Sequence, residues 1–203
     1  MSLAELGMVV NSNFAKPLNE QARDMKYCGA YVIESSRAFK PDKSGWYKVI
    51  AVGASGTPAH GSSYRSTGGA GGVAIKTIRL DANNEYSVSF ASGTVSFDGL
   101  VQATKGGDGT RNNGGSGGSA DGGDLNYYGN SGSVQSTNTG RLNGASVGVY
   151  IPELMRREEK ETVSGYGILG YGASGGVVDT VDDSYEGTAQ KAAVIIIPLE
   201  LEE

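Results

Sequence analysis

The chain has 203 residues, of which 33 are glycines, and hydrophobic residues make up only 38% of it. Its net charge is −5 and it contains no block of basic residues, which argues against nucleic acid or an anionic membrane as a partner. The one cysteine, Cys28, excludes an intrachain disulfide. No segment has the pattern of a signal peptide, and the longest apolar run, 192–197, is too short to cross a bilayer. We therefore expect no membrane insertion, and a small core with a loop-rich periphery.

Residues 1–38 are polar and contain only short apolar pieces, which predicts an N-terminal lead-in that packs on the domain or on another subunit. The domain itself is expected at 39–203. It opens with a proline-and-glycine turn followed by the aromatic and β-branched run 46–52, which predicts a strand. The apolar run 192–198 predicts a strand buried on both faces. Because neither run suits an exposed edge, we expect both in one sheet.

Two hairpins are expected between these strands. The runs 73–80 and 86–90 flank a polar turn at 81–84, and we interpret them as paired strands. A second pair, 94–97 and 100–103, flanks Asp98–Gly99, a dipeptide favoured in two-residue turns with positive φ. The sequence therefore predicts a mostly β protein, an antiparallel β-sandwich.

Glycine is concentrated in three clusters, at 53–72, 106–132 and 165–176. Several of these glycines recur every third residue, which is the period of an extended polyglycine-II helix. The series that share such a lattice are Gly106, Gly109, Gly115 and Gly118, then Gly114, Gly117 and Gly123, and finally Gly167, Gly170 and Gly176. The alternative is a set of flexible, irregular loops.

The sequence offers little catalytic or metal-binding chemistry. His60 is the only histidine and has no second ligand type near it in sequence, so we expect no metal site, no cofactor and no enzyme. The glycine-rich run 114–125 is similar to a calcium-binding nonapeptide, but Ser119 occupies the position of the aspartate ligand. Pro152 and the charged run after it predict a short helix near 152–161, either a partner-docking element or a solvated insertion.

Tyrosine, arginine and asparagine side chains stand among the glycines, which is the composition of recognition loops. The candidate ligand-binding residues are Tyr64, Arg65, Arg111, Asn112, Tyr127, Tyr128, Asn130 and Tyr171. We expect Tyr64, Arg65, Tyr127 and Tyr128 to reach solvent at one end of the domain. The alternative is that the tyrosines pack onto the glycine backbone as local cores.

Several segments within 39–198 resemble the glycine-rich C-terminal domains of phage and prophage tail-fibre proteins. They are Phe-x-Pro at 39–41, Ser-Gly-x-Tyr-Lys-Val-x-Ala-Val-Gly-Ala-Ser-Gly at 44–56, Gly-Gly-Ala-Gly-Gly at 68–72, Tyr-Gly-Ala-Ser-Gly-Gly at 171–176, and the apolar strand 193–198. The resemblance implies a β-sandwich with glycine-rich loops whose distal parts bind host surface receptors. The short Gly-Ala-Ser-Gly of 53–56 and the charged segment 153–161 depart from the pattern, and the first predicts short polyglycine-II segments.

From these observations we expect a non-enzymatic, receptor-binding tip of a phage tail fibre or related adhesin. It would lie on the virion, outside the cell, and contact a host glycan or surface protein. Fibres are usually homotrimers, and an upstream fibre segment would be a further partner. Two alternatives stay open: a structural or ice-binding glycine-rich protein, which needs a flat face of repeated threonine or alanine, and a polysaccharide-degrading tail enzyme, which needs a pair of carboxylates in a groove.

Overall fold

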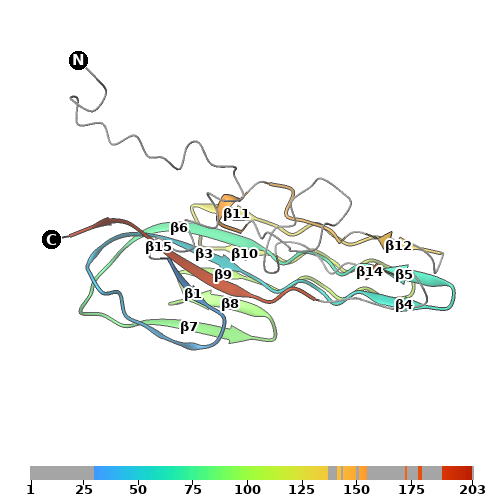
Figure 1. Cartoon of the computed structure of the whole chain (residues 1–203), viewed down its shortest axis with the longest axis horizontal. Helices are drawn as coiled ribbons and strands as arrows, with labels where there is room; N and C mark the ends of the chain where they lie inside the picture. The colour runs from blue at the N-terminus through green and yellow to red at the C-terminus, as the bar shows by residue number, and fades with distance from the viewer. Residues whose placement is uncertain are drawn as a thin grey trace, which may run out of the picture.

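The structure, a computed structural model, describes residues 30–136, 141–142, 144–149, 151–154, 172, 178–179 and 189–202. Its body is a sandwich of two five-stranded antiparallel sheets (Figure 1), which confirms the expected fold class. The first sheet has the order β1 (Tyr31–Ile33), β15 (Ala193–Leu201), β3 (Gly45–Val52), β6 (Val73–Leu80) and β11 (Leu125–Tyr127). The second has the order β10 (Ala120–Asp121), β9 (Val101–Ala103), β8 (Thr94–Phe97), β7 (Tyr86–Ala91) and β2 (Arg37–Phe39).

The main core lies between the two sheets. Alternate residues of β3, including Tyr47 and Val49, point inward and pack with Val95 and Phe97 of β8. The ring of Phe97 stacks on that of Tyr86 at 5.8 Å between centroids. The buried Tyr47 hydroxyl donates a hydrogen bond of 2.7 Å to the Lys43 carbonyl, so its polar end is satisfied.

A second, smaller core covers the outer face of the first sheet. Ile50 of β3 and Ile195 of β15 pack there against Val147, Ile151 and Leu154. The 3₁₀ turn η2 (Pro152–Leu154) holds the covering segment in place, because Glu153 pairs with Lys48 of β3 at 2.7 Å. The helix expected near 152–161 is present only as this turn; residues 155–161 lie outside the described residues.

The two most apolar runs pair directly, as expected. Ala193–Pro198 runs antiparallel to Tyr47–Val52, with Ile195 opposite Ile50. Val194 and Ile196 face the main core while Ile195 faces the second one, so burial of β15 on both faces is confirmed. The β8–β9 pair is also confirmed, with positive φ angles of 50° at Asp98 and 67° at Gly99.

The hairpin expected from 73–80 and 86–90 is wrong. β6 pairs with β3 along its whole length and with β11 at Val73–Ile75, and neither ladder of β6 includes β7. The turn after β6 instead takes the chain across to the second sheet, where β7 pairs with β2 and β8. Hydrogen bonds fix this crossing, since Asp81 accepts from the Asn83 amide at 2.8 Å and donates its own amide to the Tyr86 hydroxyl at 2.8 Å.

The expected boundary at residue 39 also needs correction. β1 pairs with β15 in the first sheet and β2 pairs with β7 in the second, so residues 31–38 belong to the sandwich. The physical reason is that β15, apolar on both faces, needs a partner on the edge away from β3. Residues 1–29 of the expected lead-in lie outside the described residues.

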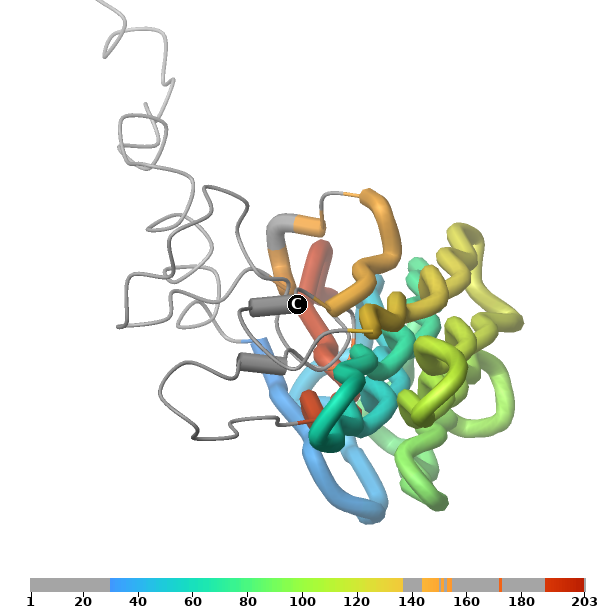
Figure 2. The backbone as a smooth tube through the Cα atoms, turned by 90° about the vertical axis from the view of Figure 1, so that its right-hand side faces the viewer, coloured from blue at the N-terminus to red at the C-terminus, as the bar shows by residue number. Residues whose placement is uncertain are grey.

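Five extended segments without ladder pairing continue beyond the sandwich and form what we call the glycine bundle (Figure 1). They are 53–57, 67–72, 104–109, 114–119 and 129–133. Figure 2 looks along the bundle from its far end. The central segment, 67–72, is buried throughout and is hydrogen-bonded to each of the other four.

The hydrogen bonds of the bundle follow threefold geometry. In the central segment, Gly69 donates to Gly107 at 3.0 Å, whereas the next residue, Ala70, donates to Asn130 in a different segment at 3.1 Å. A β-strand can bond to only two neighbours, so a segment bonded to four has the geometry of polyglycine II. These segments are therefore not the irregular loops of the alternative interpretation.

The three-residue lattice seen in the sequence has a direct structural cause. Residues three apart face the same neighbour. The pairs of bonds that show this are Gly106 to Ala54 with Gly109 to Thr57, and Gly115 to Thr67 with Gly118 to Ala70, all between 2.8 and 3.0 Å. A Cβ atom at Gly69 would lie 1.9 Å from the Ser116 carbonyl oxygen, which explains why glycine is needed there. Of the cluster at 165–176, only Gly172 is among the described residues.

Candidate functional site

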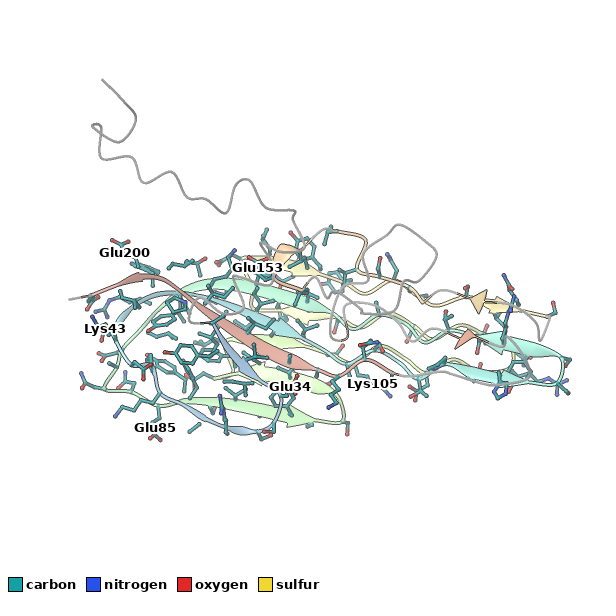
Figure 3. All side chains as sticks on the ribbon, viewed as in Figure 1. Glu34, Lys43, Glu85, Lys105, Glu153 and Glu200 are labelled. Carbon is teal, nitrogen blue, oxygen red and sulfur yellow. The ribbon has the colours of Figure 1, made fainter. Side chains whose placement is uncertain are left out.

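The far end of the glycine bundle carries a small antiparallel sheet with the order β12 (Val134–Gln135), β5 (Tyr64–Ser66) and β4 (Ala59–Gly61). The turn 110–113 follows bundle segment 104–109 at the same end, because Gly109 bonds to Thr57 next to β4. We call β4, β5, β12 and this turn the tip. Lys43 and Glu200 mark the opposite end of the molecule in Figure 3, and Lys105 lies between the two ends.

One face of the tip sheet carries a polar row. Arg65 of β5 lies directly opposite His60 of β4 on one side and Gln135 of β12 on the other, which places the three side chains on the same face. The Gln135 side-chain oxygen accepts hydrogen bonds from Arg65 Nε at 3.1 Å and from Nη2 at 2.5 Å. Arg65 is only 6% exposed, and its Nη1 atom is buried without a hydrogen-bond partner. Arg65 therefore does not reach solvent as expected from the sequence.

The other face of the tip sheet carries Tyr64. Its ring lies over Gly61 on the neighbouring strand, where an added Cβ atom would come within 2.3 Å of the ring. The tyrosine is half-buried, so it combines packing on glycine with an exposed edge. Val134 of β12 is exposed on the same face.

All four residues of the turn 110–113 are exposed, and they are Thr110, Arg111, Asn112 and Asn113. The turn is closed by a 2.8 Å bond from the Thr110 amide to the Asn113 carbonyl, which leaves Arg111 and Asn112 at its apex. A closed turn holds these two side chains outward without a core of its own.

The tip carries more positively than negatively charged side chains. Asp108, at the base of the turn, is engaged by Lys105 at 2.7 Å and by the Thr57 amide at 2.7 Å, and these bonds hold its pKa below the usual value. Among the residues that the structure describes, Arg65 and Arg111 form no ion pair. The tip therefore offers cationic, amide and aromatic groups in a chain that is acidic overall.

The expectation that Tyr127 and Tyr128 share an end with Tyr64 and Arg65 is wrong. Tyr127 ends β11, where it pairs with Val73 at the sandwich end of the bundle, and it packs on the second core. The six bundle residues 67–72 separate Val73 from β5, which at the rise of this helix is about 20 Å. Tyr128 is 65% exposed beside Tyr127.

Two further candidates have other positions. Asn130 contributes its backbone carbonyl to the bundle, as acceptor from the Ala70 amide, and is exposed. Tyr171 lies outside the described residues. Gln135 was missed by the sequence analysis, because no motif marks it; only recognition of 64–66 and 134–135 as paired strands would have placed it beside Arg65.

The described residues contain no group of three or more histidine, cysteine, aspartate or glutamate side chains that could hold a metal ion. Within the same part of the chain, no helix is long and apolar enough to span a membrane. No protein-family model matches the sequence, and a search of curated proteins finds no significant match.

Proposed function

We propose that the chain is a receptor-binding tip of a phage or prophage tail fibre, without enzymatic activity, which attaches the virion to a glycan or protein of the host surface. The observation that carries this proposal is the tip itself. Its sheet and turn lie at the end of the molecule away from the sandwich and expose side chains that contribute little to either core. Such groups at an extremity suit contact with a partner.

The glycine bundle suits the role of a rigid support. Its segments are joined by backbone hydrogen bonds in several directions, so their stability does not depend on side chains at the tip. A rigid support reduces the conformational entropy that loops lose when they bind a partner. The tip chemistry can therefore serve recognition, while the bundle and the sandwich maintain the fold.

Tyr64, Arg111 and Asn112 are the side chains that we assign to receptor contact. Tyrosine offers a large contact surface at low entropy cost, and its ring can cover a sugar face, while asparagine and arginine donate hydrogen bonds to hydroxyl or carbonyl groups. Tyr128 is more exposed than Tyr64 but lies outside the tip, so it serves as a matched control.

The experiment measures adhesion of the purified full-length chain to a panel of bacterial strains and to a glycan array. On a strain that binds the wild type, Tyr64→Ala combined with Asn112→Ala should lower adhesion at least about tenfold, since interface aromatics contribute strongly to affinity. Tyr128→Ala should leave adhesion unchanged, and both variants should unfold cooperatively. Equal adhesion of the tip variant and the wild type would contradict the assignment of the tip.

A further inference from the structure

The guanidinium of Arg65 is the most incompletely satisfied buried group among the described residues. Arginine has five N–H donors and cannot lose its charge in a protein. Among the described residues, its acceptor is the neutral side-chain oxygen of Gln135, which takes bonds from Nε and Nη2. Nη1 is buried without an acceptor. A buried cation that lacks an anionic partner destabilises the fold unless some other group completes it.

Other residues of the described structure do not supply the missing anion. The carboxylate nearest to the tip in sequence, Asp108, is occupied by Lys105 and by the Thr57 amide. Gln135 stands on the Nε and Nη2 side of the guanidinium, so the Nη1 side is the unfilled one. An oxyanion matches the planar, two-pronged geometry of that side better than a neutral group does.

We propose that Arg65 is the centre of an oxyanion site that takes the carboxylate, phosphate or sulfate group of an acidic saccharide. His60 and Gln135 flank Arg65 on the same face, and both residues are exposed, so the row reaches solvent on either side of Arg65. The saccharide identity of the ligand rests on the proposed function. The oxyanion site itself rests on Arg65 alone.

The test titrates the full-length chain with glucose, glucuronate, glucose 6-phosphate and inorganic sulfate, by calorimetry and by NMR of the Arg65 side-chain Nε–H. We expect the acidic compounds to bind and to shift the Arg65 signal, and glucose to do neither. Arg65→Gln should weaken binding of the acidic compounds at least about tenfold, because a charge-assisted hydrogen bond is lost. The matched control is Arg37→Gln, which removes an exposed cation of β2 in the sandwich and should leave binding of sulfate unchanged.

A second variant keeps the test informative if Arg65→Gln does not fold. Gln135→Glu retains the arginine and gives it a carboxylate from within the chain. We expect this variant to unfold at a higher temperature than the wild type and to bind glucuronate and glucose 6-phosphate at least about tenfold more weakly. Binding by Gln135→Glu at wild-type strength, or no response of Arg65 to any acidic compound, would overturn the site.

The same variants separate this site from the proposed function. If Tyr64→Ala with Asn112→Ala abolishes adhesion to host cells while no acidic compound shifts the Arg65 signal, the receptor-binding tip stands and the oxyanion site is refuted. If acidic compounds bind at Arg65 but the wild type adheres to no strain or glycan, the site stands and the proposed function is refuted. Binding of sulfate without the saccharide acids would show an adventitious ion only and would overturn the ligand class.

Discussion

Replacing Gly69 by alanine tests whether the glycine bundle is held together by close backbone contact. Gly69 lies in the central segment and its φ angle is not positive, so alanine can adopt its backbone conformation. Any loss of stability must therefore come from the added methyl group. That group would lie 1.9 Å from the Ser116 carbonyl oxygen, where about 3.3 Å is the usual closest approach of carbon to oxygen.

The magnitude follows from the bonds that this clash would break. Segment 114–119 would have to move away by about 1.4 Å, which is incompatible with normal hydrogen-bond lengths. The bonds lost are Gly107 to Ser116, Gly115 to Thr67 and Gly118 to Ala70. At about 1 kcal/mol or slightly more for each bond, offset by up to about 1 kcal/mol from the stiffer unfolded chain, we expect the free energy of unfolding to fall by about 2–4 kcal/mol.

The assay is urea unfolding followed by circular dichroism, with the free energy extrapolated to water. Ser116→Ala is the control, because it alters the exposed partner residue of the same contact without adding a Cβ atom. Its effect should stay within about 0.5 kcal/mol. A Gly69→Ala variant as stable as the wild type would show that the segments can move apart without loss of stability. Close backbone packing would then not be what holds the bundle together.

Two further predictions concern the sandwich. Glu153→Ala should lower the free energy of unfolding by about 1.5–3 kcal/mol, because it removes the shielded Lys48 ion pair that fixes η2. The control Glu202→Ala removes an exposed ion pair with Arg79 and should lower it by less than about 1 kcal/mol. Thermal unfolding of both variants measures the difference, and equal losses would contradict the role of Glu153. The hydrogen bond from Tyr31 to Asp42, aided by burial, raises the pKa of Tyr31 to about 12, so its contribution is complete below pH 10 and is lost as the pH rises through about 12. Between those values the wild type should lose more stability than Tyr31→Phe, as measured by urea midpoints, and parallel losses would refute the role of the hydroxyl.

The parts of the fold that could be predicted from the sequence are those set by local chemistry. The apolar composition of 192–198 dictates burial on both faces, and Asp98–Gly99 dictates a tight turn because both of its residues adopt positive φ. The partner of β6 could not be predicted in the same way. Its pairing depends on which edges β3 and β11 leave open, and that is a property of the assembled sheet.

The candidate site could be predicted only in part, for the same reason. The glycine period indicates that segments pack side by side, but it does not state where along the bundle each residue falls. Tyr64 and Tyr127 both stand beside glycine-rich segments in the sequence, yet Tyr127 lies at the sandwich end because β11 pairs with β6. Arg65 resembles an exposed loop arginine in the sequence, and its burial follows from strands β4 and β12 on either side of it.

The bundle explains how a chain with so few apolar residues can hold the tip away from its core. A protruding loop usually needs its own apolar core or a disulfide to stay rigid, and the described part of the bundle has neither. Glycine replaces both by letting each segment bond to several neighbours through its backbone. The exposed side chains of the tip then contribute little to the fold, whereas Arg65 and Ser66 are buried. Arg65 is buried in the tip sheet, so a change there affects stability and chemistry together, which is why Gln135→Glu should strengthen the fold while it removes the site.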